Sequence, residues 1–168
     1  EHTDYNGGFV FPAAITYSST IYVRQTNDGK IKLAASDLPD RVVLDIGKLN
    51  DYRDLKWGNY QAGVAYVLQR AGYDICSCEI LYHDTVPFGS GLSSSAAIEV
   101  VMALTLATFS NEKNGITEPV SMIEMAKLSQ KAENDYCGVS CGIMDQFASA
   151  MGKKDHAIFL DCKDLSFK

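Results

Sequence analysis

The segment Pro87-Phe88-Gly89-Ser90-Gly91-Leu92-Ser93-Ser94-Ser95-Ala96-Ala97 joins a glycine-rich turn to the start of a helix, and the rest of the chain is interpreted around it. Two glycines on either side of one serine let the backbone turn tightly and approach a ligand closely. The three serines that follow offer an N-cap and several hydroxyl groups, and the apolar run from Ala96 predicts a helix. This arrangement predicts a phosphate site, because free N–H groups and the positive end of the helix dipole face the ligand.

This segment is not a P-loop, in which a lysine follows the last glycine, because Leu92 occupies that position. The chain also has no Lys or Arg between Arg70 and Lys113. We therefore expect backbone N–H groups, serine hydroxyls and a metal ion to hold the phosphate. The alternative interpretation of the segment is a flexible Gly/Ser turn before a buried helix.

Composition limits the kind of protein that this chain can be. Its 168 residues suffice for one domain with a sizeable core. The net charge of −6 argues against a nucleic-acid partner, and no apolar run suggests a membrane span. The five cysteines lack the spacing of a zinc site, so we expect reduced thiols in a cytoplasmic protein.

Local patterns predict strands near the front of the chain and helices behind them. We expect residues 20–26 and 31–34 to pair as a hairpin across the turn at 27–30. Residues 9–15 are apolar and predict a buried strand or a strand that leads into a short turn. Further strands are expected at residues 42–44, 75–83 and 157–160.

Hydrophobic periodicity predicts the helices. The first is expected from Lys56 to about Ala71, and the second from the glycine-rich segment to about Phe109. The third is expected to have Pro119 in its first turn and to end near Tyr136. One unit of α+β class results, without repeats or linkers.

The segment 87–97 resembles the ATP-phosphate loop of the galactokinase, homoserine kinase, mevalonate kinase and phosphomevalonate kinase superfamily. Two further segments narrow the resemblance to the galactokinases. The first, Glu1-His2-Thr3-Asp4-Tyr5-Asn6-Gly7-Gly8, is similar to the galactokinase signature. The second, Cys141-Gly142-Ile143-Met144-Asp145-Gln146-Phe147, is similar to the segment that carries the catalytic aspartate of that family. The resemblance extends from the first residue to about Cys162.

This resemblance implies a fold like that of ribosomal protein S5 domain 2, as the N-terminal lobe of a two-lobed small-molecule kinase. Residues 1–168 would be a single lobe truncated at both ends, with the C-terminal lobe of the same polypeptide as its partner. Family members carry a catalytic Arg just upstream of the signature, at positions that this chain does not include. We therefore expect little kinase activity from these residues alone.

The resemblance also implies a reaction, the Mg²⁺-dependent transfer of the γ-phosphoryl group of ATP to the anomeric hydroxyl of D-galactose. Asp145 would be the catalytic base. The residues implied to bind the sugar are Glu1, His2, Thr3, Asp4 and Gly142. Those implied to bind ATP are Gly89, Ser90, Gly91, Leu92, Ser93, Ser94 and Ser95, with Trp57 and Tyr60 near the adenine. Ser95 and Glu133 would hold Mg²⁺, whose preferred ligands are oxygen atoms.

Alternatives remain at two levels. An N-acetylgalactosamine kinase and a non-catalytic galactose sensor of the same fold are the competing functions, although the intact serines at 93–95 and Asp145 favour an enzyme. From the residues alone, Asp145 is also explained as a helix cap, Glu133 as a solvent-facing charge and Trp57 as core packing. The polar start of the chain is also explained as a solvated tail.

Overall fold

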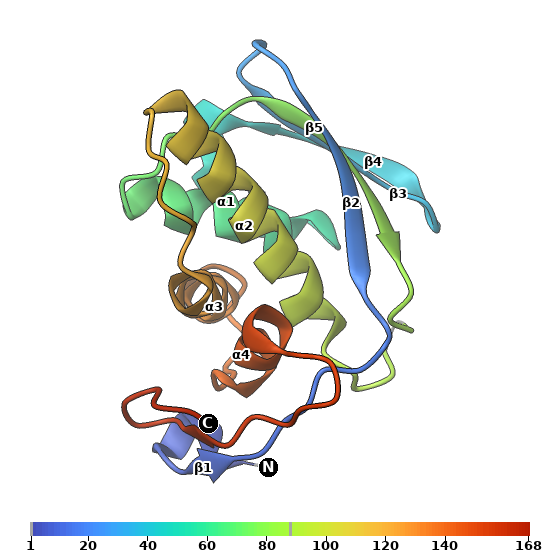
Figure 1. Ribbon diagram of the computed structural model, residues 1–168. Helices are drawn as coiled ribbons and strands as arrows, with labels where there is room; N and C mark the ends of the chain where they lie inside the picture. The colour runs from blue at the N-terminus through green and yellow to red at the C-terminus, as the bar shows by residue number, and fades with distance from the viewer. Residues whose placement is uncertain (1, 88) are drawn as a thin grey trace.

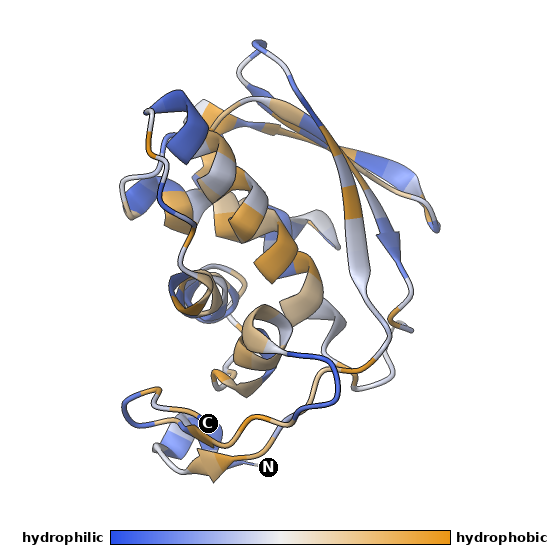
Figure 2. Ribbon diagram, in the orientation of Figure 1, coloured by the Kyte–Doolittle hydropathy of each residue, from blue (hydrophilic) through white to orange (hydrophobic). Residues whose placement is uncertain are grey.

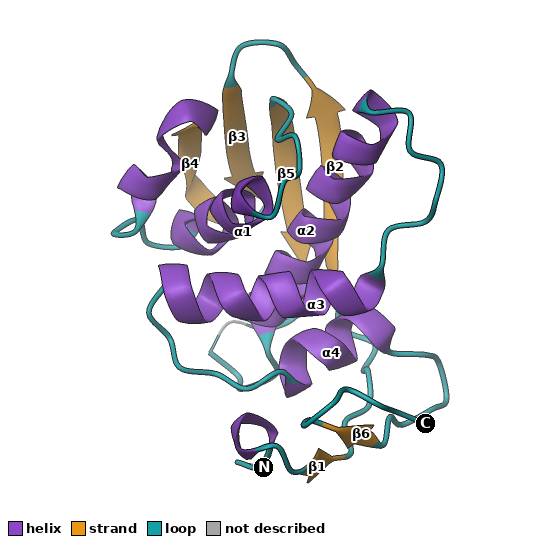
Figure 3. Ribbon diagram, turned by 90° about the vertical axis from the view of Figure 1, so that its left-hand side faces the viewer, coloured by secondary structure: helices purple, strands orange, loops and turns teal. Residues whose placement is uncertain are grey.

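The structure is a computed structural model that describes residues 2–87 and 89–168. It has a four-stranded sheet with helices on one face, and a second group of helices farther from the sheet (Figure 1). A small two-stranded sheet lies beyond these helices, close to both ends of the chain (Figure 3). The α+β class predicted from the sequence is confirmed.

The main sheet contains β2 (Ser19–Gln25), β3 (Lys30–Ala35), β4 (Leu38–Asp45) and β5 (Cys78–Asp84) in the order β2-β5-β3-β4. The predicted hairpin is therefore wrong, because β5 lies between β2 and β3 and pairs with both. The β3–β5 pair is parallel and the other pairs are antiparallel. Cys78, Ile80 and Tyr82 alternate as buried residues along β5, which suits a central strand.

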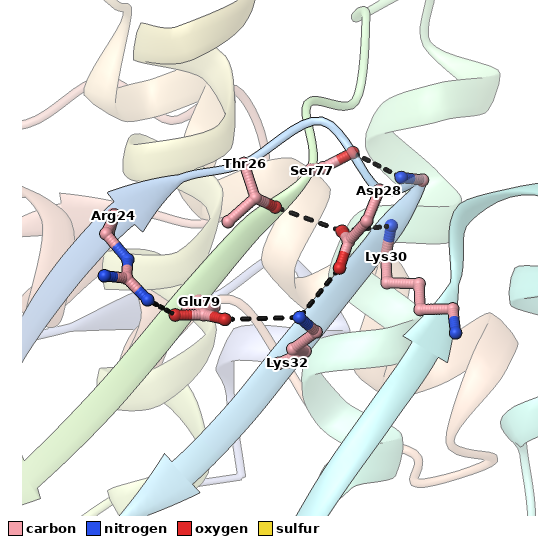
Figure 4. A network of polar contacts seen from close by, with 8 residues as sticks. Arg24, Thr26, Asp28, Lys30, Lys32, Ser77 and Glu79 are labelled. Atoms are coloured by element: carbon pink, nitrogen blue, oxygen red, sulfur yellow. Dashed lines mark hydrogen bonds and ion pairs between the residues drawn. The ribbon is translucent and has the colours of Figure 1, made fainter.

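Ion pairs on the outer face of the sheet follow this strand order (Figure 4). Glu79 of β5 accepts hydrogen bonds from Arg24 of β2 and from Lys32 of β3. The Lys32 Nζ atom is 3.2 Å from Glu79 and 2.7 Å from the Asp28 carboxylate. Such exposed pairs add little stability, but opposite charges on neighbouring strands favour this register over a slipped one.

Two helices cover the inner face of the sheet, α1 (Gly58–Arg70) and α2 (Ser94–Lys113). The core lies between them and the sheet, and Figure 2 shows the apolar residues along α2 and its polar C-terminal end. This helix runs one turn beyond its predicted end at Phe109. Its length and composition would suffice to cross a membrane, but it packs here against α1, α3 and α4. The largest core side chains are Ile31, Leu33, Leu44, Leu68, Tyr82, Met102, Leu106 and Met125.

The next helices form the layer beyond α2. They are α3 (Met122–Lys131), the π-helix η3 (Ala132–Tyr136) and α4 (Met144–Met151). The Ser121 side chain caps α3 by accepting from the Glu124 N–H. Pro119 lies outside this helix, so its predicted place in the first turn is wrong; an N-cap serine with its acceptor oxygen decides the start.

The ends of the chain meet in the small sheet. There β1 (Phe9–Val10) pairs with β6 (Leu160–Asp161), and η1 (Asp4–Asn6) precedes β1. The strand predicted for residues 9–15 is reduced to two residues, and Phe9, Phe11 and Ile15 are exposed. The segment crosses the surface instead of joining the main sheet, and this path brings the N-terminal loop beside α4. The last strand is also shorter and later than the predicted 157–160. The helix η2 (Ile46–Tyr52) connects β4 toward α1.

Candidate functional site

The glycine-rich segment forms a sharp turn ahead of α2. Gly89 and Gly91 have φ angles of +69° and +73°, which glycine adopts without strain. The hydroxyl of Ser90 closes the turn by donating to the Pro87 carbonyl at 2.7 Å. Phe88 lies outside the described residues. The left-handed backbone at positions 89 and 91 therefore explains why both residues are glycine.

The start of α2 leaves its N–H groups without a side-chain partner. Ser93 occupies the N-cap position with a φ of +61°, but its side chain makes no cap hydrogen bond. The prediction that a serine caps this helix is therefore wrong, because the left-handed backbone turns the hydroxyl away from that role. The first N–H groups of any α-helix lack intrahelical acceptors, so those of Ser94 and Ser95 are suited to an anion.

An open pocket of about 890 Å³ lies beside this turn. Gly91, Leu92 and Ser93 line one part of it, and Asp145 lines another. Much of the remaining wall is apolar and comes from α2 and the segment that follows β1. The pocket therefore places the predicted base and the predicted phosphate loop around one space.

Asp145 sits in the first turn of α4, and it does not cap that helix. Ile143 holds the N-cap position, and its own side chain makes no cap hydrogen bond. A carboxylate in the first turn is favoured by the helix dipole, and the Asp145 side chain is half-buried at the pocket wall. The cap alternative for Asp145 is therefore wrong, and its carboxylate remains free for a ligand.

The N-terminal loop reaches the start of α4. Oδ2 of Asp4 accepts a hydrogen bond of 3.4 Å from the Met144 N–H. Gly142 lies so close that a Cβ atom on it would be 1.8 Å from the same oxygen. These contacts place Asp4 and Gly142, 138 positions apart, within a few residues of Asp145; they are unlike those of a solvated tail.

Other loop residues have internal partners. The His2 Nδ1 atom is 2.9 Å from the Tyr5 hydroxyl. The Thr3 hydroxyl donates to the Phe9 carbonyl at 2.9 Å, so its hydrogen is used within the loop and only its oxygen lone pairs remain for a ligand. Glu1, predicted to bind sugar, lies outside the described residues. The structure thus gives Asp4 the closest link to Asp145.

Three buried polar side chains meet behind the pocket. Glu99 of α2 is 0% exposed, Glu133 of η3 is 6% exposed and Gln146 of α4 is 1% exposed. The Gln146 Nε2 atom is 2.7 Å from Glu133 Oε2 and 3.3 Å from Glu99 Oε2. The interpretation of Glu133 as a solvent-facing charge is therefore wrong, because η3 turns it into the molecule. Burial and the neighbouring Glu133 raise the pKa of Glu99 to about 9.

The donor set of this region fits Mg²⁺. Ser95 lies one helical turn before Glu99 on α2, so these two side chains share a face. The Glu99 Oε1 atom is buried and has no hydrogen-bond partner among the described residues. The described part of the chain has no group of three His, Cys, Asp or Glu residues that would hold a metal unaided. An ion here would need further oxygens from phosphate and water, which is typical of Mg²⁺.

Trp57 and Tyr60 lie at the start of α1 and do not line the pocket. Trp57 is partly buried and packs against the core, as the core-packing interpretation predicts. Its Nε1 atom is nevertheless buried without a hydrogen-bond partner in the described chain. Burial, followed by the Glu133 charge, raises the pKa of the Tyr60 hydroxyl.

The sequence analysis missed Glu99, Gln146 and Arg53. The sequence could have indicated Glu99, since it is the only charged residue between Ser94 and Ser110 in an apolar helix. No sequence pattern indicates Arg53. Its guanidinium donates to the Asp135 and Tyr136 carbonyls and lies 4.4 Å from the centre of the Tyr136 ring. It thereby holds the end of the π-helix that buries Glu133.

Two known protein-family models match the segments that form this site. The model of the GHMP kinases N terminal domain matches residues 59–153, more than half of the chain and the part from α1 to α4. The chain belongs to the GHMP kinase family. A second model, the galactokinase galactose-binding signature, matches residues 1–25 of this GHMP kinase chain, including the loop that carries Asp4.

Relatives of this GHMP kinase chain include proteins named galactokinase. One from Clostridium tetani is 44% identical over 168 residues, which is all of this chain and 42% of the relative. The crystal structure of Lactococcus lactis galactokinase complexed with galactose is 39% identical, with a TM-score of 0.86 over all of this chain and 42% of that one. Methanococcus jannaschii mevalonate kinase, at 20% identity, has a TM-score of 0.77 over all of this chain and half of that one, and shares the fold. The chain thus spans less than half the length of the galactokinases it matches.

Proposed function

We propose that the complete protein carrying this chain transfers the γ-phosphoryl group of ATP to the anomeric hydroxyl of D-galactose. The observation that carries the proposal is the meeting of Asp4 with Gly142 at the start of α4, beside Asp145 and its pocket. The signature match over residues 1–25 supports galactose as the sugar. No specific observation favours N-acetylgalactosamine or a sensor role.

The chemistry assigned to each group follows from its position. Asp4 and His2, with Glu1, bind sugar hydroxyls, and the close approach of Gly142 leaves room for the Asp4 carboxylate. Asp145 accepts the proton from the anomeric hydroxyl as that oxygen bonds to the γ-phosphorus and the bond to ADP breaks. Positioning and charge neutralisation supply most of the rate in such a transfer.

The nucleotide phosphates are assigned to the glycine-rich turn. The N–H groups at the start of α2 and the hydroxyls of Ser93, Ser94 and Ser95 face them. Ser95 and Glu133 would hold Mg²⁺, which neutralises phosphate charge when bound. Trp57 and Tyr60 are assigned to the adenine side. The turn itself contains no Lys or Arg, so backbone dipoles take on the role that a lysine has in a P-loop.

The remaining assignments concern the surroundings of the lobe. We propose that a C-terminal lobe of the same polypeptide completes the enzyme, since the matched galactokinases are more than twice as long. The exposed aromatic side chains near the pocket suit burial by that lobe; they are Phe9, Phe11, Tyr17 and Phe159. We place the enzyme in the cytoplasm, in keeping with its five free cysteines.

The direct test is turnover by the complete protein. We expect the formation of galactose 1-phosphate to depend on ATP and Mg²⁺. A coupled assay for ADP measures the rate. Homoserine and mevalonate serve as the comparison substrates because related kinases act on them. Turnover of either one without turnover of galactose would contradict the proposal.

Replacing Gly91 by Val tests the nucleotide site. A Cβ at Gly91 meets no atom within 4 Å, so the side chain would extend into the pocket instead of into the protein. The φ of +73° adds a backbone strain of about 1–2 kcal/mol for a non-glycine residue. We expect ATP affinity to fall at least about tenfold, as measured by nucleotide titration of the complete protein.

Gly29 provides a matched control for this experiment. It has a φ of +72° and open space at its Cβ, but it lies in the turn between β2 and β3. Gly29→Val should cost similar stability and leave ATP affinity unchanged. Equal ATP affinities for a folded Gly91→Val variant and this control would remove the turn from the nucleotide site.

A further inference from the structure

Gln146 occupies a position for which the proposed reaction assigns no role, although it follows the candidate base directly in sequence. It is 1% exposed, and its Nε2 atom lies between the carboxylates of Glu99 and Glu133. These two residues come from α2 and η3, so the three side chains join three separate elements. A residue that joins three elements behind a pocket can set the geometry of that pocket.

The chemistry of the amide suits this position better than that of other side chains. Its NH₂ group has two donors, and the two short distances lead to one oxygen on each carboxylate. The amide is oriented with Nε2 toward Glu133 Oε2 and Glu99 Oε2, and its Oε1 atom is buried without a partner among the described residues. A carboxylate at this position would add a third acidic group to a buried pair, and a shorter side chain would not reach both.

We propose that Gln146 is a positioning residue, which holds Glu133 at the angle needed to bind the metal ion and ties that carboxylate to the helix carrying Asp145. This inference rests on the proposed function for the role of Glu133. It adds a physical link between the metal site and the base: Asp145 lines the pocket while the next residue is anchored in the carboxylate pair.

The consequence is specific to the metal. Groups that orient a metal ligand from behind typically affect metal affinity by 10–100-fold when they are removed. Loss of the Gln146 amide frees the Glu133 carboxylate to rotate, and it leaves two buried acidic groups without their shared donor. Metal binding should therefore weaken by more than the general loss of stability explains.

The test compares Gln146→Met with Gln61→Met in the complete protein. Methionine matches glutamine in length and has no N–H donor. Gln61 of α1 is also 1% exposed, but in the described part of the chain no hydrogen bond joins it to the carboxylate pair. The rise in melting temperature is measured as Mg²⁺ is titrated at saturating ADP, and Mn²⁺ binding is measured separately by electron paramagnetic resonance. Neither measurement needs sugar turnover.

We expect Gln146→Met to raise the metal midpoint in both titrations by about 10–100-fold, and Gln61→Met to leave it within twofold while also lowering the melting temperature. A folded Gln146→Met variant with the wild-type midpoint would overturn the inference. If that variant does not fold, the same titrations are made on Gln146→Asn, which keeps the amide but is one methylene too short to reach both carboxyl groups. A raised metal midpoint for Gln146→Asn would support the inference, and the wild-type midpoint would overturn it. Normal metal binding to the wild-type protein without galactose turnover would instead count against the proposed function.

Discussion

Asp145→Asn is expected to lower kcat by about 10²–10⁴-fold, the usual contribution of a general base. Asparagine keeps the shape of the side chain but cannot accept the proton that leaves the sugar hydroxyl. The Asp145 side chain makes no cap hydrogen bond on α4, so its replacement should cost the helix only the dipole interaction of the carboxylate, about 0.3–1 kcal/mol. The measurement is steady-state kinetics on the complete protein, with thermal melts of the same samples.

Asp155→Asn is the matched control, because Asp155 is exposed and does not line the pocket. Its φ of +63° suits asparagine as well as aspartate. Both variants should melt like the wild type, and only Asp145→Asn should lose turnover. A normal kcat for Asp145→Asn would remove Asp145 from the chemistry.

Gly142→Ala is expected to raise the KM for galactose by about 10–100-fold. The new methyl group would lie 1.8 Å from Oδ2 of Asp4, far inside van der Waals contact, so the carboxylate must move. A hydrogen bond to a charged group contributes about 1.5–3 kcal/mol, and about 1.4 kcal/mol corresponds to a tenfold change in affinity. Initial-rate measurements over a range of galactose concentrations give the KM.

A double-mutant cycle tests whether this effect passes through Asp4. Asp4→Ala removes the group that the new methyl displaces, so Gly142→Ala should then add little to the KM. Strict additivity of the two changes would show that they act independently. In that case the contact between Gly142 and Asp4 would not matter for sugar binding.

Local signals in the sequence were sufficient to predict the parts of the site that depend on short-range geometry. The glycines at 89 and 91 are needed for their positive φ angles, and the apolar run after Ser95 forms a helix close to the predicted one. The family resemblance supplied the pairing of the N-terminal loop with the segment around Asp145. No local pattern would have joined these two segments.

Two of the errors came from contacts between distant residues. Residues 20–26 and 31–34 have the pattern of a hairpin, and only the insertion of β5 separates them. Glu133 has the local pattern of a surface charge near a helix end, and the π-helix with its Arg53 contacts turns it inward. The contacts of Arg24 with Glu79 and of Arg53 with Tyr136 each join residues more than 50 positions apart.

The insertion of β5 between β2 and β3 has a consequence for how this chain folds while it is being synthesised. Glu79 joins Arg24, 55 positions earlier, so the central position of the sheet remains empty until α1 and then β5 have emerged. During that interval the turn after β2 would favour a direct pairing of β2 with β3, which must open again to admit the late strand. Contacts of such long sequence separation slow folding, and the unpaired strand edges of the nascent chain are sites where association with other chains begins.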